Sequence, residues 1–128
     1  MTDFERVGGA DGLNRLIRDL LAREHEDMII GFLFRDVDME RLLVHETAFA
    51  AAHLGGPRAY VGRPITTVHQ PKRIQRGWFR RRIALLRCVL TDNSVPQDVI
   101  DRWVSTELAL EPSVTDGTDC GPPAPEGS

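Results

Sequence analysis

The stretch Asp38-Met-Glu-Arg-Leu-Leu-Val-His-Glu-Thr-Ala-Phe-Ala-Ala-Ala-His53 decides the fold, because it has the pattern of one amphipathic helix. Residues three and four apart lie on the same side of a helix. One face therefore carries Leu42, Glu46, Phe49, Ala50 and His53, with His45 at its edge. Leu54-Gly-Gly-Pro57 follows, and glycine and proline there predict the end of the helix.

Glu46 is out of place on a face that would otherwise be apolar. A buried polar group costs free energy unless it finds a partner, so we expect a polar group opposite Glu46. A short segment over residues 65–70 follows and carries His69. One histidine facing another across a gap is the arrangement that a metal or haem site needs.

The chain before this helix is also helical in pattern. Asp11 is the expected N-cap of a helix reaching about His25. Its apolar side comprises Leu13, Leu16, Ile17, Leu20 and Leu21; its polar side comprises Arg15, Arg18, Asp19, Arg23, Glu24 and Glu26. Residues 28–34 are expected to continue the helix and then to form a tight corner that turns Phe32 and Phe34 inward.

Two more helices are expected after residue 74. The first covers about residues 75–91, with Trp78, Phe79, Ile83, Leu85, Leu86, Val89 and Leu90 on its apolar side. Residues 92–94 break it, and Pro96 suits the first turn of a last helix. That helix is expected to bury Val99, Ile100, Trp103, Val104 and Leu108. Since no segment alternates as a strand would, the sequence predicts an all-α fold.

Length and composition predict one domain of ordinary solubility. The chain has 128 residues and a formal net charge of -3, which disfavours bulk electrostatic binding to nucleic acid. Cys88 and Cys120 do not make a disulfide framework, which suits a reducing cytoplasm. No apolar run is long enough for a membrane span. We expect a folded domain over residues 1–111 and a disordered tail over residues 112–128, which is rich in Ser, Thr, Asp, Gly and Pro.

Several short stretches carry a family resemblance. They are residues 4–9, 32–34, 36–39, 54–57, 60–62 and 68–70, and the match continues through Ile74, Phe79, Val95 and Pro96. The chain resembles the truncated haemoglobins, the small two-over-two globins of bacteria and protists, and most of all their first group. The resemblance covers about residues 4 to 110. It implies a two-over-two helical sandwich that binds one haem b.

The resemblance also implies roles for individual residues. His69 matches the proximal ligand of the haem iron, and Phe34 matches the aromatic residue that packs against the porphyrin. The apolar walls of the haem pocket would be Leu42, Phe49, Leu54, Tyr60, Ile65, Val68, Ile74, Phe79 and Ile83, for each of which ordinary packing is the alternative. Lys72 and Arg73, with Arg63, could pair with the propionates.

The distal side, opposite the proximal histidine, departs from the family pattern. A Tyr and a Gln usually donate hydrogen bonds to bound oxygen there, whereas this chain has Leu21 and Glu46 at the matching positions. Leu21 donates nothing, and Glu46 donates only when protonated. The distal pocket would comprise Leu21, Leu42 and Glu46. His45 either ligates the iron as a second histidine or lies at the pocket rim beside a propionate.

The remaining charged residues have simpler interpretations. Basic side chains gather on the long helix and before it: Lys72, Arg73, Arg76, Arg80, Arg81, Arg82 and Arg87. A solvated face explains such a run, and a docking patch for an acidic redox partner is the alternative. His25 and His53 lack metal-ligand spacing and are taken as incidental.

The expected function is reversible binding of a diatomic gas: oxygen, nitric oxide or carbon monoxide. One alternative is a haem enzyme, a nitric oxide dioxygenase with a reductase partner or a peroxidase, in which Glu46 serves as an acid–base group. Another is a haem-free helical interaction module. The sequence gives no oligomeric state.

Overall fold

The computed structural model describes residues 1–57 and 75–114, and every element in these two ranges is helical. The elements in chain order are α1 (Asp3–Arg6), α2 (Gly9–Glu26), the 3-10 helix η1 (Gly31–Phe34), α3 (Met39–Leu54), α5 (Arg76–Asp92), α6 (Gln97–Leu108) and α7 (Glu111–Val114). The four long helices lie where the periodicity predicts them. The all-α fold class is therefore confirmed.

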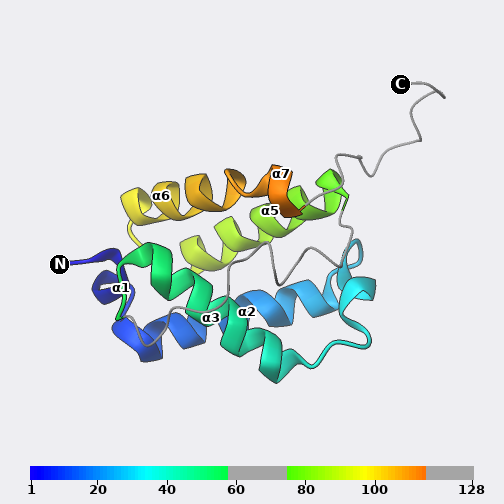
Figure 1. Cartoon of the computed structure of the whole chain (residues 1–128), viewed down its shortest axis with the longest axis horizontal. Helices are drawn as coiled ribbons and strands as arrows, with labels where there is room; N and C mark the ends of the chain where they lie inside the picture. The colour runs from blue at the N-terminus through cyan, green and yellow to red at the C-terminus, as the bar shows by residue number, and fades with distance from the viewer. Residues whose placement is uncertain (58–74, 115–128) are drawn as a thin grey trace.

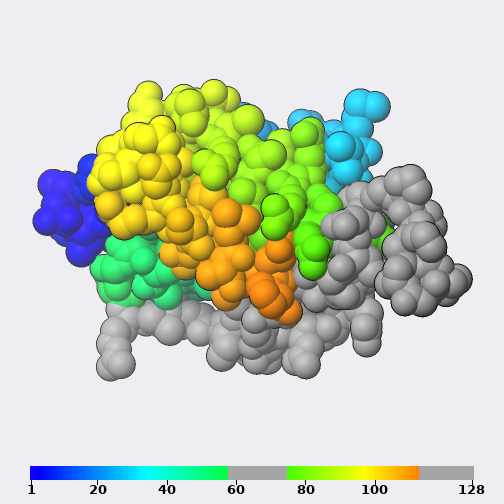
Figure 2. Space-filling model, turned by 90° about the horizontal axis from the view of Figure 1, so that it is seen from above, coloured from blue at the N-terminus to red at the C-terminus, as the bar shows by residue number. Residues whose placement is uncertain are grey.

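The long helices form two layers of two. Figure 1 shows α2 and α3 in the lower layer and α5 and α6 in the upper layer. Helix α2 packs against both α3 and α5, while α6 contacts α5 and α3. Seen from above, α5 and α6 cover much of the upper surface (Figure 2). This arrangement is the expected two-over-two sandwich.

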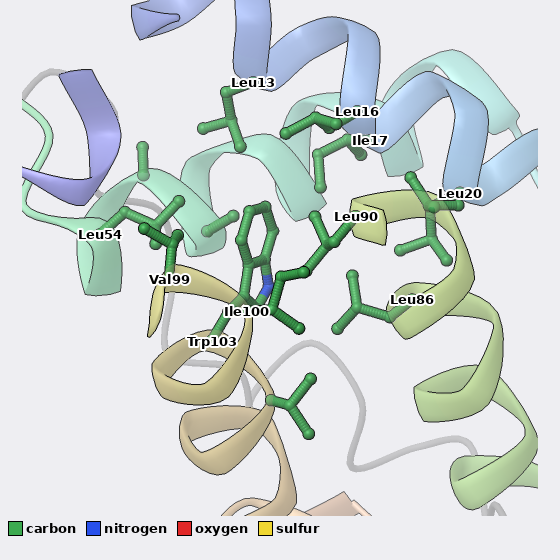
Figure 3. Close-up of a cluster of buried hydrophobic side chains, with 14 of the residues drawn as sticks. Leu13, Leu16, Ile17, Leu20, Leu54, Leu86, Leu90, Val99, Ile100 and Trp103 are labelled. Carbon is green, nitrogen blue, oxygen red and sulfur yellow. The ribbon is translucent and has the colours of Figure 1, made fainter. Parts of the chain in front are cut away.

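The core between the layers is centred on Trp103, which is completely buried. Figure 3 shows its indole among side chains from all four long helices: Leu13, Leu16, Ile17, Leu20, Leu54, Leu86, Leu90, Val99 and Ile100. Burying apolar surface contributes roughly 25 cal/mol per Å² and is the main force holding such layers together. Most residues of the predicted apolar stripes on α2, α5 and α6 are buried. The partly buried ones are Leu42 and Phe49 of α3, Trp78 and Leu85 of α5, and Leu108 of α6.

The N-terminal segment is more ordered than a simple lead-in. Thr2 and Glu5 form a capping box, with Glu5 N donating to Thr2 Oγ1 at 3.1 Å and Thr2 N donating to Glu5 Oε1 at 3.0 Å. Asp11 is not an N-cap, which corrects the sequence prediction. Helix α2 begins earlier, at Gly9, because Gly8 reverses the chain with a φ of 103°.

The corner after α2 differs from the prediction in two ways: the helix does not continue beyond Glu26, and Phe32 does not turn inward. Asp27 accepts hydrogen bonds from the backbone N–H groups of Ile29 and Ile30, at 3.0 and 3.1 Å, and so turns the chain. Ile30 then fills the core position at 1% exposure. Phe32 is 46% exposed and meets the Trp78 ring edge-on, with centroids 5.2 Å apart, while Phe34 is half-buried.

Helix α3 begins and ends at the residues that the sequence marks. The Asp38 side chain accepts from Arg41 N at 3.2 Å, which satisfies one free N–H of the first turn. Gly55 ends the helix with a φ of 85°, a conformation that residues with a Cβ rarely adopt. The two boundaries fix the length of the face that carries His45 and Glu46.

The described structure runs a little beyond the expected domain boundary. Helix α7 continues to Val114, and Glu111 accepts from Arg80 Nε at 2.9 Å. Residues 115–128 lie outside the described part, so the disordered tail stays a prediction. No helix of the described residues is long and apolar enough to cross a membrane.

Candidate functional site

The polar group opposite Glu46 is the guanidinium of Arg82. Glu46 is 8% exposed on α3, and its Oε2 accepts from Arg82 Nη2 at 3.1 Å. Arg82 belongs to α5, so the pair spans the two layers. The expectation that a polar partner faces Glu46 is confirmed.

Arg82 contacts two further buried carboxyl groups. Its Nε lies 3.4 Å from Glu24 Oε2 of α2, and its Nη1 donates to Glu107 Oε1 of α6. The other oxygen of Glu107 accepts from Trp103 Nε1 at 2.8 Å. One guanidinium therefore connects all four long helices, and we call Glu24, Glu46, Arg82 and Glu107 the Arg82 cluster.

The Arg82 cluster contains more acid than base. With all groups ionised, three carboxylates and one guanidinium sum to a net charge of about -2. Burial raises the pKa of Glu24 to about 8, against the opposing attraction of Arg82. Burial also raises the pKa of Glu46, again with Arg82 opposing. Burial lowers the pKa of Arg82, but the three carboxyl groups together raise it above its usual range.

Two sequence assignments are wrong here. Glu24 was expected on the polar side of its helix and Arg82 on a solvated face, yet Glu24 is 1% exposed and the Arg82 side chain 15%. Helical spacing could have identified both residues as buried. Glu24 follows Leu20 by four residues, and Arg82 follows Phe79 by three, which places each charge on a buried stripe.

Glu107 was not identified from the sequence. It follows Trp103 by four residues and is 4% exposed. The same spacing rule would have found it, because a residue four positions after a buried tryptophan lies on the same face.

The predicted distal and wall residues of the described part fall into two groups. Leu21, Leu54, Phe79 and Ile83 are buried, while Phe34, Leu42, His45 and Phe49 are half-buried. His45 immediately precedes Glu46 and lies close enough for its charge to lower the pKa of that carboxyl. The structure thus brings Leu42, His45 and Glu46 together on one helix.

The predicted proximal side cannot be placed. His69 and the associated residues Tyr60, Arg63, Ile65, Val68, Lys72, Arg73 and Ile74 lie outside the described residues. Their assignments remain predictions from the resemblance.

His53 packs against aromatic rings on two helices. Its ring lies edge-on between Phe49 and Trp103, with centroid distances of 5.1 and 5.7 Å. Nε2 has no hydrogen-bond partner among the described residues, and burial lowers the pKa of the imidazole. The half-buried ring of His53 therefore packs beside the Arg82 cluster.

A two-over-two sandwich of this kind with a polar centre defines a globin-type domain. The sequence model of the bacterial-like globins matches residues 2–111. The chain therefore belongs to the bacterial-like globin family, and the relatives that it is similar to include group 1 truncated haemoglobins.

Three comparisons illustrate the relationship. The chain is 29% identical over 114 residues to a group 1 truncated hemoglobin from Mycolicibacterium paratuberculosis, covering 89% of this chain and 84% of the relative. The truncated hemoglobin from Tetrahymena pyriformis, solved in its Fe(III) form, superposes with a TM-score of 0.81 at 23% identity, covering 90% and 98% of the two chains. The 2/2 hemoglobin from Synechococcus sp. PCC 7002, solved in the cyanomet state with covalently attached heme, gives 0.80 at 21%, covering 89% and 98%.

Family membership implies haem binding, and the described half of the site suits a haem. Phe34 of η1 and Leu42 and Phe49 of α3 are large apolar side chains that are only half-buried, and α3 also carries the buried Glu46. A porphyrin has a large apolar body, which these apolar side chains would help to hold, and an iron centre, which would supply the ligand chemistry.

Proposed function

We propose that this chain holds haem b through His69 and reversibly binds a diatomic gas, oxygen, nitric oxide or carbon monoxide, on the opposite face. The bound iron would supply the ligand chemistry, while the chain sets axial ligation, polarity and access. Family membership and the residues around His69 support this role. We place the protein in the cytoplasm, where a reductase would keep the iron ferrous.

The observation that carries the proposal is the position of Glu46. A carboxyl group buried on α3 and held by Arg82 lies on the helix where the family places its ligand-facing residue. Leu21, the other distal position, is buried and donates no hydrogen bond. We therefore expect weaker stabilisation of bound oxygen than a Tyr and a Gln would give.

The test is the ultraviolet–visible spectrum of the purified chain reconstituted with haem, ferric and ferrous. The parent should give a histidine-ligated spectrum, and His69→Ala should lose it. His25→Ala is the matched control, because His25 is exposed at the end of α2 and should change nothing. A His69→Ala protein that coordinates haem as the parent does would disprove the proximal assignment.

A second candidate is an iron with two histidine ligands, which His45 favours. His45 is half-buried on α3 next to Glu46, so it lies on the correct helix for a distal ligand. Such a protein would be low-spin in both redox states and would become high-spin in His45→Ala. Electron transfer or gated gas binding would then replace an open distal site as the function.

The enzymatic alternative finds less support. Nitric oxide dioxygenation needs well stabilised oxygen, which buried Leu21 does not provide. Glu46 as an acid–base group would show as turnover that is lost in Glu46→Ala and kept in His45→Ala. A folded chain that takes up no haem would instead indicate an interaction module.

A further inference from the structure

Glu24 is the unusual member of the Arg82 cluster. Its side chain is 1% exposed, and its Oε1 has no hydrogen-bond partner among the described residues. Its Oε2 lies 3.4 Å from Arg82 Nε, whereas Glu46 Oε2 lies 3.1 Å from Arg82 Nη2. Arg82 therefore holds Glu24 less closely than it holds Glu46. An oxygen buried without a donor costs free energy as a carboxylate and much less as a carboxylic acid.

We propose that Glu24 is a proton-binding site at the centre of the sandwich, and that its proton compensates for charge placed beside Glu46. Arg82 links the two carboxyl groups, because its Nε contacts Glu24 and its Nη2 contacts Glu46. Negative charge next to Glu46 attracts Arg82 more strongly and leaves Glu24 less compensated. A proton at Glu24 then restores the balance.

Each helix packed around Glu24 contributes charged or titratable groups. Those that act on Glu24 are Asp27, which follows α2, Glu46 of α3, Arg82 of α5 and Glu107 of α6. On α3, His45 acts on Glu46, and His53 lies near Arg82 and Glu107. Asp27 is held by Arg81 at 2.6 Å, and its pKa is lowered, so it stays ionised. His53 is neutral above about pH 7 in both the folded and unfolded chain. Above that pH, the Arg82 cluster therefore dominates proton binding in this part of the core.

The first experiment needs no haem and follows the unfolding equilibrium constant between about pH 7 and pH 9. Burial raises the pKa of Glu24 to about 8, so the folded chain holds a proton that the unfolded chain has lost. The unfolding constant of the parent should rise about tenfold across this range as the proton leaves. Glu24→Gln keeps the shape of the protonated acid and should change by about twofold or less.

Glu26→Gln is the matched control, because Glu26 is exposed two residues along the same helix. It should show the same rise as the parent. A parent without the rise, or a Glu24→Gln protein that retains it, overturns the proposal.

A direct measurement covers the case in which Glu24→Gln does not fold. The glutamate carboxyl carbons of the 13C-labelled parent are titrated by NMR. One carboxyl with a midpoint near pH 8 supports the proposal, whereas midpoints below about pH 6 for every glutamate overturn it.

Glu46→Gln tests the coupling in the same haem-free protein. It removes one negative neighbour of Glu24, so the titration midpoint of Glu24 should fall and the tenfold rise should shrink. An unchanged midpoint would separate Glu24 from Glu46 and overturn the compensation.

A last experiment rests on the proposed function and uses azide, an anion, as the probe for the ferric haem-loaded chain. Calorimetry at about pH 8, in buffers of different ionisation enthalpy, should show uptake of up to about half a proton, since Glu24 is then half protonated. Glu26→Gln should show the same uptake as the parent, whereas Glu24→Gln should show none. If the chain binds haem but takes up no proton when azide binds, Glu24 does not respond to charge at the iron, and the proposed function stands. A chain that takes up no haem refutes the proposed function, while the pH experiments still decide the proton site.

Discussion

Arg82 of α5 and Glu46 of α3 form an ion pair of 3.1 Å across the two layers of the sandwich, and their side chains are 15% and 8% exposed. Taking charges out of water is costly, so such a pair adds less to stability than its Coulomb attraction suggests. Its larger effect is on geometry. One guanidinium with carboxyl partners on three helices fixes how α2, α3 and α6 sit against α5.

Arg82→Met should therefore destabilise the fold strongly. Removing one partner leaves buried carboxyl groups without compensation, which costs about 3–5 kcal/mol. Chemical denaturation measures the loss, and Arg87→Met, at an exposed position of the same helix, should change stability by about 0.5 kcal/mol or less.

Adding Glu24→Gln, Glu46→Gln and Glu107→Gln to Arg82→Met removes the uncompensated charges. Much of the lost stability should return, because neutral amides are cheaper to bury than carboxylates. A quadruple variant as unstable as Arg82→Met alone would mean that packing by the arginine stem, and not charge, is what the core requires.

The helices were predictable because their apolar residues recur at strict spacing. Only part of the Arg82 cluster could be predicted. Glu46 was recognised because it interrupts an apolar face, and that interruption correctly implied a partner. Arg82 was missed because it lies in the run Arg80-Arg81-Arg82, where adjacent charges suggest a solvated surface. Adjacent residues point 100° apart on a helix, so only Arg82 of the three faces the core.

The corner at residues 28–34 was mispredicted for a different reason. Hydrophobicity alone indicated that the phenylalanines turn inward, but the Asp27 side chain sets the turn and selects Ile30 for the core. Side-chain capping of a turn is a local hydrogen-bond choice that an apolar count does not reveal.

Asp27 should make the fold sensitive to acid. Hydrogen bonds from Arg81, followed by those of Ile30 and Ile29, lower its pKa to about 2 from 3.8 in spite of some desolvation. A depressed folded pKa gives stability that is present above about pH 4 and is lost as the pH falls toward 2. Solvent screens the pair, because the Arg81 side chain is 39% exposed. Asp27→Asn should therefore lose about 1 kcal/mol near pH 7 together with that pH dependence, as measured by denaturation at several pH values. The exposed neighbour variant Glu26→Gln should keep the acid transition of the parent. An unchanged acid transition in Asp27→Asn would contradict the role of this carboxylate.

Gly12→Ala should be severely destabilising although alanine favours helices. A Cβ on Gly12 would clash with the carbonyl oxygen of Val7, a contact with backbone that no side-chain rotation relieves. Either α1 moves away from α2 or the helix starts later, and the loss should be about 2 kcal/mol or more. Thermal denaturation measures this loss. The control is Asp11→Ala, a substitution at the exposed neighbouring residue. Equal stability of the two variants would show that α1 is not packed where this contact requires.

Glu46→Gln should slow oxygen release from the ferrous haem-loaded protein. Arg82 only donates hydrogen bonds, so it would hold the amide oxygen of Gln and leave the NH2 group to face the ligand. A new hydrogen bond to bound oxygen is worth about 1 kcal/mol, which corresponds to a dissociation rate about fivefold slower. Stopped-flow mixing with an oxygen scavenger measures this rate. Glu40→Gln, exposed on the same helix, should release oxygen as the parent does. Faster release from Glu46→Gln would mean that the parent carboxyl group already donates to the ligand, and that it does so as a protonated acid.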